Sequence, residues 1–236
     1  MNKEETNFIE LGKGLLIVIS YFLLGNILSA FFSSLIKKGI FPDTNMIKSI
    51  LTLFIYIILA TFYYYLYRKK INKEWKTFKK NPKKNLSTGF NYWLKGLFIM
   101  LVSNAIIIFL FKLGNSVNEQ TNIELIKRSM SIQVPITVLI VPFIEEIVFR
   151  GSFYKMTKNK HIFAWSTGIL FGFLHIVSSL DKLTGFLFLI PYSAMGIAFG
   201  YLYKKTDSIF PSMFMHMIHN GITIFFIIIA IKMGVY

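Results

Sequence analysis

The chain contains no cysteine among its 236 residues, and only 11 acidic residues accompany 26 lysines and arginines. Without cysteine, neither a disulfide nor a thiolate ligand nor a thiol nucleophile can take part in a mechanism. Any metal must therefore be bound by His, Asp, Glu or Asn. The net charge of +15 does not indicate nucleic-acid binding, because the basic residues lie between apolar segments and form no recognisable binding motif.

Long polar segments are also scarce, since hydrophobic residues make up 54% of the chain. Apolar runs of about 18 residues or more are typical of membrane-spanning helices. The sequence therefore predicts an all-α, polytopic transmembrane helix bundle of about seven helices (seven or eight). The expected spans are residues 15–36, 47–67, 92–112, 132–156, 162–180, 184–203 and 209–231.

We divide the predicted bundle into N-terminal helices, residues 1–131, and C-terminal helices, residues 132–236, without a boundary between separate domains. A basic loop is expected at residues 68–84, where nine lysines and arginines gather. Cytoplasmic loops are enriched in such residues, so we expect a cytoplasmic N-terminus and a C-terminus outside. Within this loop, two interpretations stay open: a solvated segment, or a segment on the lipid headgroups with Trp75 and Phe78 inserted.

The fourth expected span contains Glu145, Glu146 and Arg150 within an apolar stretch. Charged side chains there cost on the order of 2.5 to 3.5 kcal/mol each, so they indicate a function. Residues four apart share a helix face, so Glu146 can pair with Arg150 while Glu145 points about 100° away. The pattern predicts a neutralised pair beside a carboxylate that is available as a base.

Two later spans carry imidazoles and an amide: His175 in the fifth, and His216 with Asn220 in the seventh. We expect these groups to meet Glu145 near the middle of the membrane. His219 and His161 are expected to be bystanders.

Small residues and prolines should shape the helices around these groups. Small residues four apart predict close helix packing in the fifth and sixth spans, at Ala164, Gly168, Gly172, Gly196 and Gly200. In the fourth span, Pro135 and Pro142 are expected to distort the helix and free backbone carbonyls toward a water-lined cavity.

Three motifs follow one another on these spans: Glu-Glu-x-x-x-Arg at 145–150, Phe-x-x-x-His at 171–175 and His-x-x-x-Asn at 216–220. In this order they resemble the CAAX protease and bacteriocin-processing family of intramembrane proteases, also called the Abi family. The resemblance covers roughly residues 132–225. It implies an integral membrane endopeptidase with a peptide or protein substrate.

The resemblance also implies roles for the motif residues. Glu145 and His175 would activate a water molecule, and His216 and Asn220 would stabilise the oxyanion. Glu146 and Arg150 match the remaining charged positions and are expected to be supports.

A divalent metal such as zinc is a further expectation from the resemblance, although a glutamate-dependent route without metal is also argued for this family. If a metal is used, the expected ligands are Glu145, His175 and His216. The sequence has no His-Glu-x-x-His pair that would decide between the two routes.

We therefore expect an intramembrane endopeptidase that cuts a membrane-associated, lipidated or leader peptide, in a bacterial plasma membrane. Two alternatives stay open. One is a catalytically silent bacteriocin-immunity or scaffold protein. The other is an ion- or proton-coupled transporter, because intramembrane Glu, His and Arg also mark ion paths.

Overall fold

The computed structural model describes residues 6–180 and 183–236, and no strand occurs in these ranges. The α-helices are α1 (Phe8–Lys37), α2 (Asn45–Lys80), α3 (Pro82–Phe111), α4 (Val117–Arg128), α5 (Met130–Pro135), α6 (Val141–Glu146), α7 (Lys160–Ile176), α8 (Leu189–Thr206) and α9 (Ile209–Lys232). Two π-helical segments, η1 (Ile136–Ile140) and η2 (Ile147–Gly151), continue α5 and α6 into one rod. Short 3-10 segments, η3 (Val177–Ser179) and η4 (Leu183–Phe188), lie between α7 and α8.

Seven helical segments of the described chain are long and apolar enough to cross a membrane, and α4 is an additional short helix. This confirms the predicted all-α bundle of seven or eight helices, and the protein is an integral membrane protein. The rod of α5, η1, α6 and η2 is the fourth span. It ends at Gly151, five residues before the predicted end at 156.

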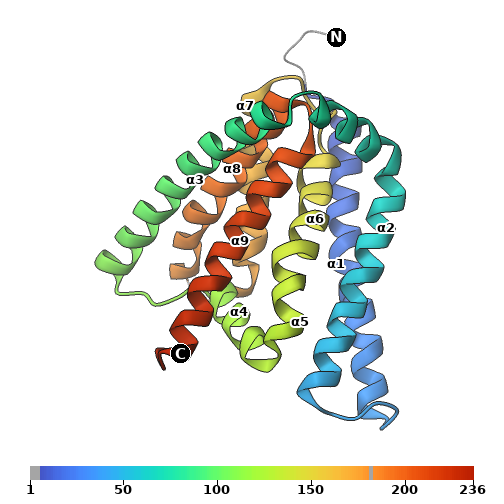
Figure 1. Ribbon diagram of the computed structural model, residues 1–236, viewed down its shortest axis with the longest axis vertical. Helices are drawn as coiled ribbons and strands as arrows, with labels where there is room; N and C mark the ends of the chain where they lie inside the picture. Colours follow the sequence, from blue (N-terminus) through green and yellow to red (C-terminus); the bar gives the residue numbers. More distant parts are fainter. Residues whose placement is uncertain (1–5, 181–182) are drawn as a thin grey trace.

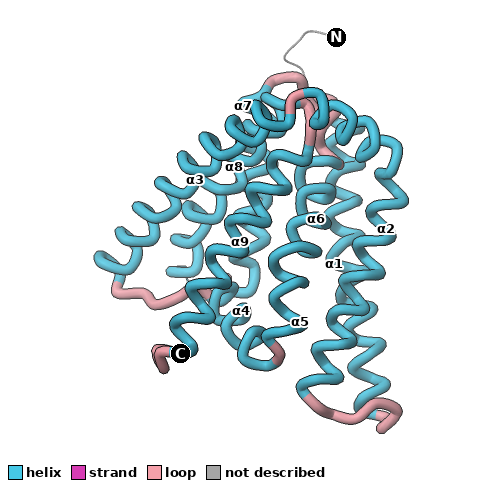
Figure 2. Tube along the Cα trace, viewed as in Figure 1, coloured by secondary structure: helices cyan, strands magenta, loops and turns pink. Residues whose placement is uncertain are grey.

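The helices run roughly side by side, with the start of α1 and the end of α9 at opposite ends of the bundle (Figure 1). The pair α1 and α2 forms one side, α3 lies at the other side, and α9 and the α5–α6 rod lie between them (Figure 2). The short helix α4 lies at the same end of the bundle as the C-terminus. An odd number of crossings requires this separation of the termini.

Helices α7 and α8 pack closely because small residues face each other along both. A Cβ atom on Gly196 would lie 2.8 Å from the carbonyl oxygen of Gly168, and one on Gly200 would lie 2.8 Å from the Cα of Ala164. A Cβ on Gly172 would likewise lie 2.8 Å from the backbone nitrogen of Ser193. The predicted small-residue packing is therefore present, and it brings the backbone of α8 against the helix that carries His175.

The predicted basic loop at residues 68–84 is wrong. Helix α2 continues to Lys80, and α3 begins at Pro82. Between Arg68 and Lys80 the chain holds good helix formers and neither Gly nor Pro, while Pro82 occupies the first position of α3, where a proline is well tolerated. The charge pattern marked the right region, but the residues themselves favour helix.

The segment around Trp75 is part of α2, and Phe78 does not insert among lipid headgroups. Phe78 is buried, and its ring lies 5.5 Å from that of Phe214 on α9, while the ring of Trp75 lies 4.7 Å from that of Phe210. These aromatic contacts attach the end of α2 to α9. Phe78 therefore packs within the protein, whereas the Trp75 side chain stays 37% exposed beside it.

A buried carboxylate fixes the same junction. Glu74 accepts hydrogen bonds from the Tyr203 hydroxyl at 2.6 Å and from the Ile209 backbone N–H at 2.9 Å, and Lys70 lies 3.4 Å away. The Ile209 N–H is at the first position of α9, where helix N–H groups lack partners and negative charge is favourable. Glu74 thus joins the ends of α2, α8 and α9.

The close approach of α7 and α8 predicts that Gly196→Ala is destabilising. The added methyl group would lie within 2.9 Å of two backbone atoms of Gly168, so the helices must separate. Overpacking of this kind costs about 1–3 kcal/mol. The thermal midpoint in detergent micelles should fall clearly.

The matched control is Gly12→Ala, because a Cβ at Gly12 of α1 meets nothing within 4 Å. This variant should unfold at or slightly above the wild-type temperature, since alanine favours helix over glycine. Equal midpoints for Gly196→Ala and the wild type would contradict the packing argument.

Candidate active site

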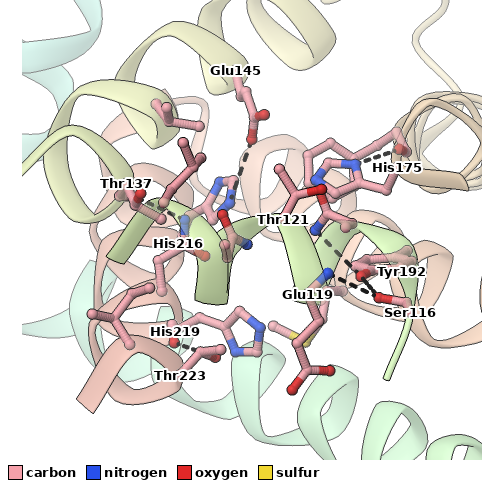
Figure 3. A pocket seen from close by; sticks show the side chains of 18 of the residues that line it. Ser116, Glu119, Thr121, Thr137, Glu145, His175, Tyr192, His216, His219 and Thr223 are labelled. Atoms are coloured by element: carbon pink, nitrogen blue, oxygen red, sulfur yellow. Dashed lines mark hydrogen bonds and ion pairs between the residues drawn. The ribbon is translucent and has the colours of Figure 1, made fainter. Parts of the chain in front are cut away.

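The predicted site residues lie around one cavity in the centre of the bundle. The cavity has a volume of about 460 Å³ and is lined from α2, α3, α4, the α5–α6 rod, α7, α8 and α9. Glu145, His175, His216 and Asn220 all line it, and the first three are shown in Figure 3. Residues 75 positions apart in sequence are thereby brought to one place.

Glu146 and Arg150 form a fully buried ion pair beside this cavity. The Arg150 Nη1 donates to Glu146 Oε1 at 2.9 Å, and both side chains are 0% exposed. Arg150 Nη2 also donates to the carbonyl oxygen of Gly196 at 3.4 Å, and the guanidinium lies 4.2 Å from the centre of the Phe171 ring. The predicted pairing is present, and the pair connects the rod to α7 and α8.

His216 connects this pair to Glu145. Its Nδ1 lies 3.0 Å from Glu146 Oε1. Its Nε2 lies 3.7 Å from Glu145 Oε2, the contact drawn in Figure 3. Because Glu146 is ionised against Arg150, its oxygen only accepts, so the Nδ1 of His216 must carry the proton. In the neutral imidazole, Nε2 is then a proton acceptor that faces Glu145.

His175 lies farther from Glu145 and is held differently. Its Nδ1 donates to the backbone oxygen of Phe171 at 2.9 Å, which leaves Nε2 as an acceptor in the neutral ring. The imidazole lies between the rings of Phe171, at 4.2 Å, and Tyr192, at 5.0 Å. His216, and not His175, is thus the imidazole within ion-pair distance of Glu145.

Asn220 is fixed by a carbonyl that the fourth span leaves free. Its Nδ2 donates to the Thr137 oxygen at 2.9 Å. In η1 the helix bonds reach back five residues, as from the Val141 N–H to the Ile136 oxygen. The next bond in this register would join position 142 to Thr137, but Pro142 has no N–H. The expectation that proline frees a carbonyl toward the cavity is therefore confirmed.

The second π-helical segment, η2, follows the two glutamates directly and contains Arg150. The Ser152 N–H bonds the Ile147 oxygen five residues back, and the Ser152 hydroxyl donates to the Val148 oxygen at 2.6 Å. Single π-helical turns occur often at functional sites because they shift side chains around a helix. The charged motif therefore lies between two such turns.

The fit of a metal can be tested on the donors that face the cavity. The Nδ1 atoms of His175 and His216 both have the outer hydrogen bonds that metal-ligating imidazoles usually make. In the described part of the chain, however, no three His, Asp or Glu side chains are grouped closely enough to hold a metal ion. Glu145, His175 and His216 as placed do not form a ligand set, so we derive no step through a metal.

Sequence comparison supports the resemblance that the motifs indicated. Residues 127–222 match the family model described as type II CAAX prenyl endopeptidase Rce1-like. The curated protein named "Putative membrane peptidase YdiL" of Bacillus subtilis (strain 168) is 27% identical over 153 residues, 61% of this chain and 59% of that protein. The "UPF0177 protein YxdF" of Lactococcus lactis subsp. lactis (strain IL1403) is also 27% identical over 153 residues, 62% of this chain and 80% of that protein.

The comparisons confirm the predicted similarity to CAAX proteases for the segment that carries all three motifs. The matched segment includes Glu145, His175, His216 and Asn220. The chain spans about 59% of the length of the Bacillus protein that it matches. No solved structure matches the chain.

Several residues at or beside the cavity make contacts that the sequence analysis did not predict. Tyr192 and Gln133 line the cavity, Gly196 provides the carbonyl for Arg150, and Thr137 provides the one for Asn220. Gly196 was predicted as a packing residue only, and Thr137 had a sequence signal because it lies five residues before Pro142. The others are ordinary residues of apolar or polar segments, which only the packing brings to the cavity.

The buried pair predicts a strongly non-additive stability effect. Arg150→Met leaves Glu146 as an uncompensated buried charge, and breaking a buried pair in this way costs about 3–5 kcal/mol. Removing both charges, in Glu146→Gln with Arg150→Met, should cost less than the sum of the two single changes. Thermal midpoints of the three variants in detergent would measure this coupling.

The matched control is Arg128→Met, which removes an exposed guanidinium from α4. Its midpoint should stay near the wild-type value. If Arg150→Met were equally harmless, the pair would not hold the site together.

Proposed function

We propose that this protein is an intramembrane endopeptidase that hydrolyses a peptide bond in a membrane-associated, lipidated or leader peptide, with Glu145 as the base. The observation that supports it is the arrangement around Glu145. Its carboxylate pairs with no Lys or Arg of residues 6–180 and 183–236, lines a central cavity, and lies 3.7 Å from an imidazole nitrogen that is oriented by a second carboxylate. Similarity to CAAX prenyl endopeptidases over the same segment supports the reaction class.

In this mechanism a water molecule donates to two acceptors, Glu145 Oε2 and His216 Nε2. As the water oxygen attacks the substrate carbonyl carbon, its proton passes to Glu145, which later gives it to the leaving nitrogen. The second proton of the water passes to His216 Nε2 as the carboxylate product forms, and the resulting positive charge is stabilised through Nδ1 by Glu146. We therefore propose His216 as a partner of the base, a different role from the oxyanion donor that the resemblance implied.

Negative charge on the substrate oxygen requires donors. Asn220 uses one Nδ2 hydrogen on Thr137 and keeps the second, so it is our proposed oxyanion donor. His175 has an acceptor nitrogen at Nε2 and becomes a donor when protonated, so we propose that it assists at the water or the oxyanion. Because the Thr137 bond fixes the amide, Asn220 needs no reorganisation when the charge develops.

For the orientation, we propose that the end with the N-terminus and the α2–α3 junction faces the cytoplasm of a bacterial cell. Lysines concentrate at this junction, and such residues are enriched on the cytoplasmic side. The cavity is lined in part by α4, at the end that holds the C-terminus (Figure 1). The proposed partners are the lipid bilayer and a peptide substrate, and nucleic acid is not among them.

The base assignment predicts that Glu145→Gln abolishes cleavage without unfolding the protein. Loss of a general base typically costs on the order of 10²–10⁴ in rate. The rate can be measured from new peptide termini in membranes of cells that express each variant. The matched control is Glu124→Gln on the exposed side of α4, which should cleave normally.

Cleavage by Glu145→Gln at the wild-type rate, with equal expression, would refute the proposed mechanism. A scaffold or immunity role would instead survive this substitution.

Metal removal provides a second test. Because the three candidate donors are not grouped as ligands, we propose a glutamate-dependent route and expect activity to persist after dialysis of the purified protein against a chelator. The rate before and after dialysis is the measurement. Loss of activity that zinc restores, but magnesium does not, would show that a metal carries the reaction.

A further inference from the structure

The charge of the cavity differs from the charge of the protein. The chain carries 26 lysines and arginines and a net charge of +15. Among the described residues that line the cavity, however, none is Lys or Arg, and two are carboxylates, Glu119 and Glu145. An acidic cavity in a basic protein attracts a positively charged group of a ligand.

Among the described residues, no hydrogen bond or ion pair of the Glu119 carboxylate explains its position. It stands three residues after the N-cap Ser116, the spacing of a capping box, in which the glutamate would accept from the Ser116 N–H. Only the other half of that box is formed, from the Glu119 N–H to the Ser116 hydroxyl at 3.2 Å. Among the described residues, no cation lies within ion-pair distance of the Glu119 carboxylate.

The Glu119 side chain is partly buried. Burial raises the pKa of its carboxyl group above the ordinary value, with no charged neighbour contributing to the shift. A cation bound beside it would relieve this cost, because opposite charge favours the ionised form. Within the part of the chain that the structure describes, no positive group compensates this carboxylate.

Glu119 also lies where two hollows meet. A second hollow of about 450 Å³ shares Glu119 and Thr223 with the central cavity and is otherwise apolar, with Phe226, Met233 and Tyr236 on its wall. Figure 3 shows Glu119 and Thr223 on the same side of the cavity, away from Glu145. A peptide that reaches Glu145 from this side passes the Glu119 carboxylate.

We propose that Glu119 binds a lysine or arginine side chain of the substrate, and that the adjoining hollow binds an apolar side chain next to it. The substrate class is thus a peptide with a basic residue beside an apolar one, a few residues from the bond that is cut. This inference rests on the proposed endopeptidase function and deepens it. Glu119 is then a residue of substrate specificity, distinct from the catalytic groups.

The test uses the purified full-length protein in detergent micelles and a peptide library from a bacterial proteome cut after glutamate, which leaves Lys and Arg inside the peptides. New termini are identified by mass spectrometry, with Glu145→Gln as the background. Wild-type cleavage sites should show Lys or Arg enriched at one fixed position. In Glu119→Gln the rate on those peptides should fall roughly three- to tenfold relative to neutral ones.

Two variants sharpen the result. Glu119→Lys should move the preference at the same position to Asp, the acidic residue that peptides cut after glutamate keep in their interior. The control Glu124→Gln, on the exposed face of α4, should keep the wild-type preference. At pH values below the raised pKa of Glu119, the wild-type preference should weaken.

The outcomes separate the two proposals. Wild-type cleavage sites without basic enrichment, or an unchanged preference in a folded Glu119→Gln protein, would overturn the specificity inference and leave the endopeptidase function standing. Sites that Glu145→Gln produces equally well, or no cleavage by the wild type at all, would overturn the proposed function and the inference with it.

Discussion

The buried pair of Glu146 and Arg150 is the interaction on which the rest of the site depends. Two charges in an apolar bundle are tolerated only when each is compensated, and here the compensation comes from several helices. Arg150 contacts the Gly196 carbonyl on α8 and the Phe171 ring on α7, while Glu146 holds His216 on α9. The pair thus fixes three helices relative to the rod that carries Glu145.

Close helix packing makes this compensation possible. Arg150 reaches a backbone oxygen of α8 at a glycine, and the same glycine lies against Gly168 of α7. A larger residue there would separate α7 from α8 and move Phe171 and His175 away from the guanidinium. The small-residue series is therefore a condition for the electrostatics of the site as well as for packing.

The adjacent glutamates differ through their neighbours alone. Glu146 is paired with Arg150, while Glu145, one position away and turned around the helix, faces a cavity and an oriented imidazole. Pro142, which follows the first π-helical segment, has no N–H for the Thr137 carbonyl, and this carbonyl fixes Asn220 instead. A single helical rod thereby provides both the base and the support for the proposed oxyanion donor.

The sequence by itself determined the helix count, the Glu146–Arg150 pairing and the glycine contacts, because these follow from apolar length and from spacing within a helix. It also predicted that Glu145, His175, His216 and Asn220 lie together, since buried polar groups in apolar spans are costly. Only the tertiary structure decided that His216 is the imidazole beside Glu145, that residues 68–80 are helix joined to α9, and that Glu119 lines the cavity. The reason is physical: spacing along one helix fixes a side chain's direction, but which neighbour it meets depends on how separate helices pack.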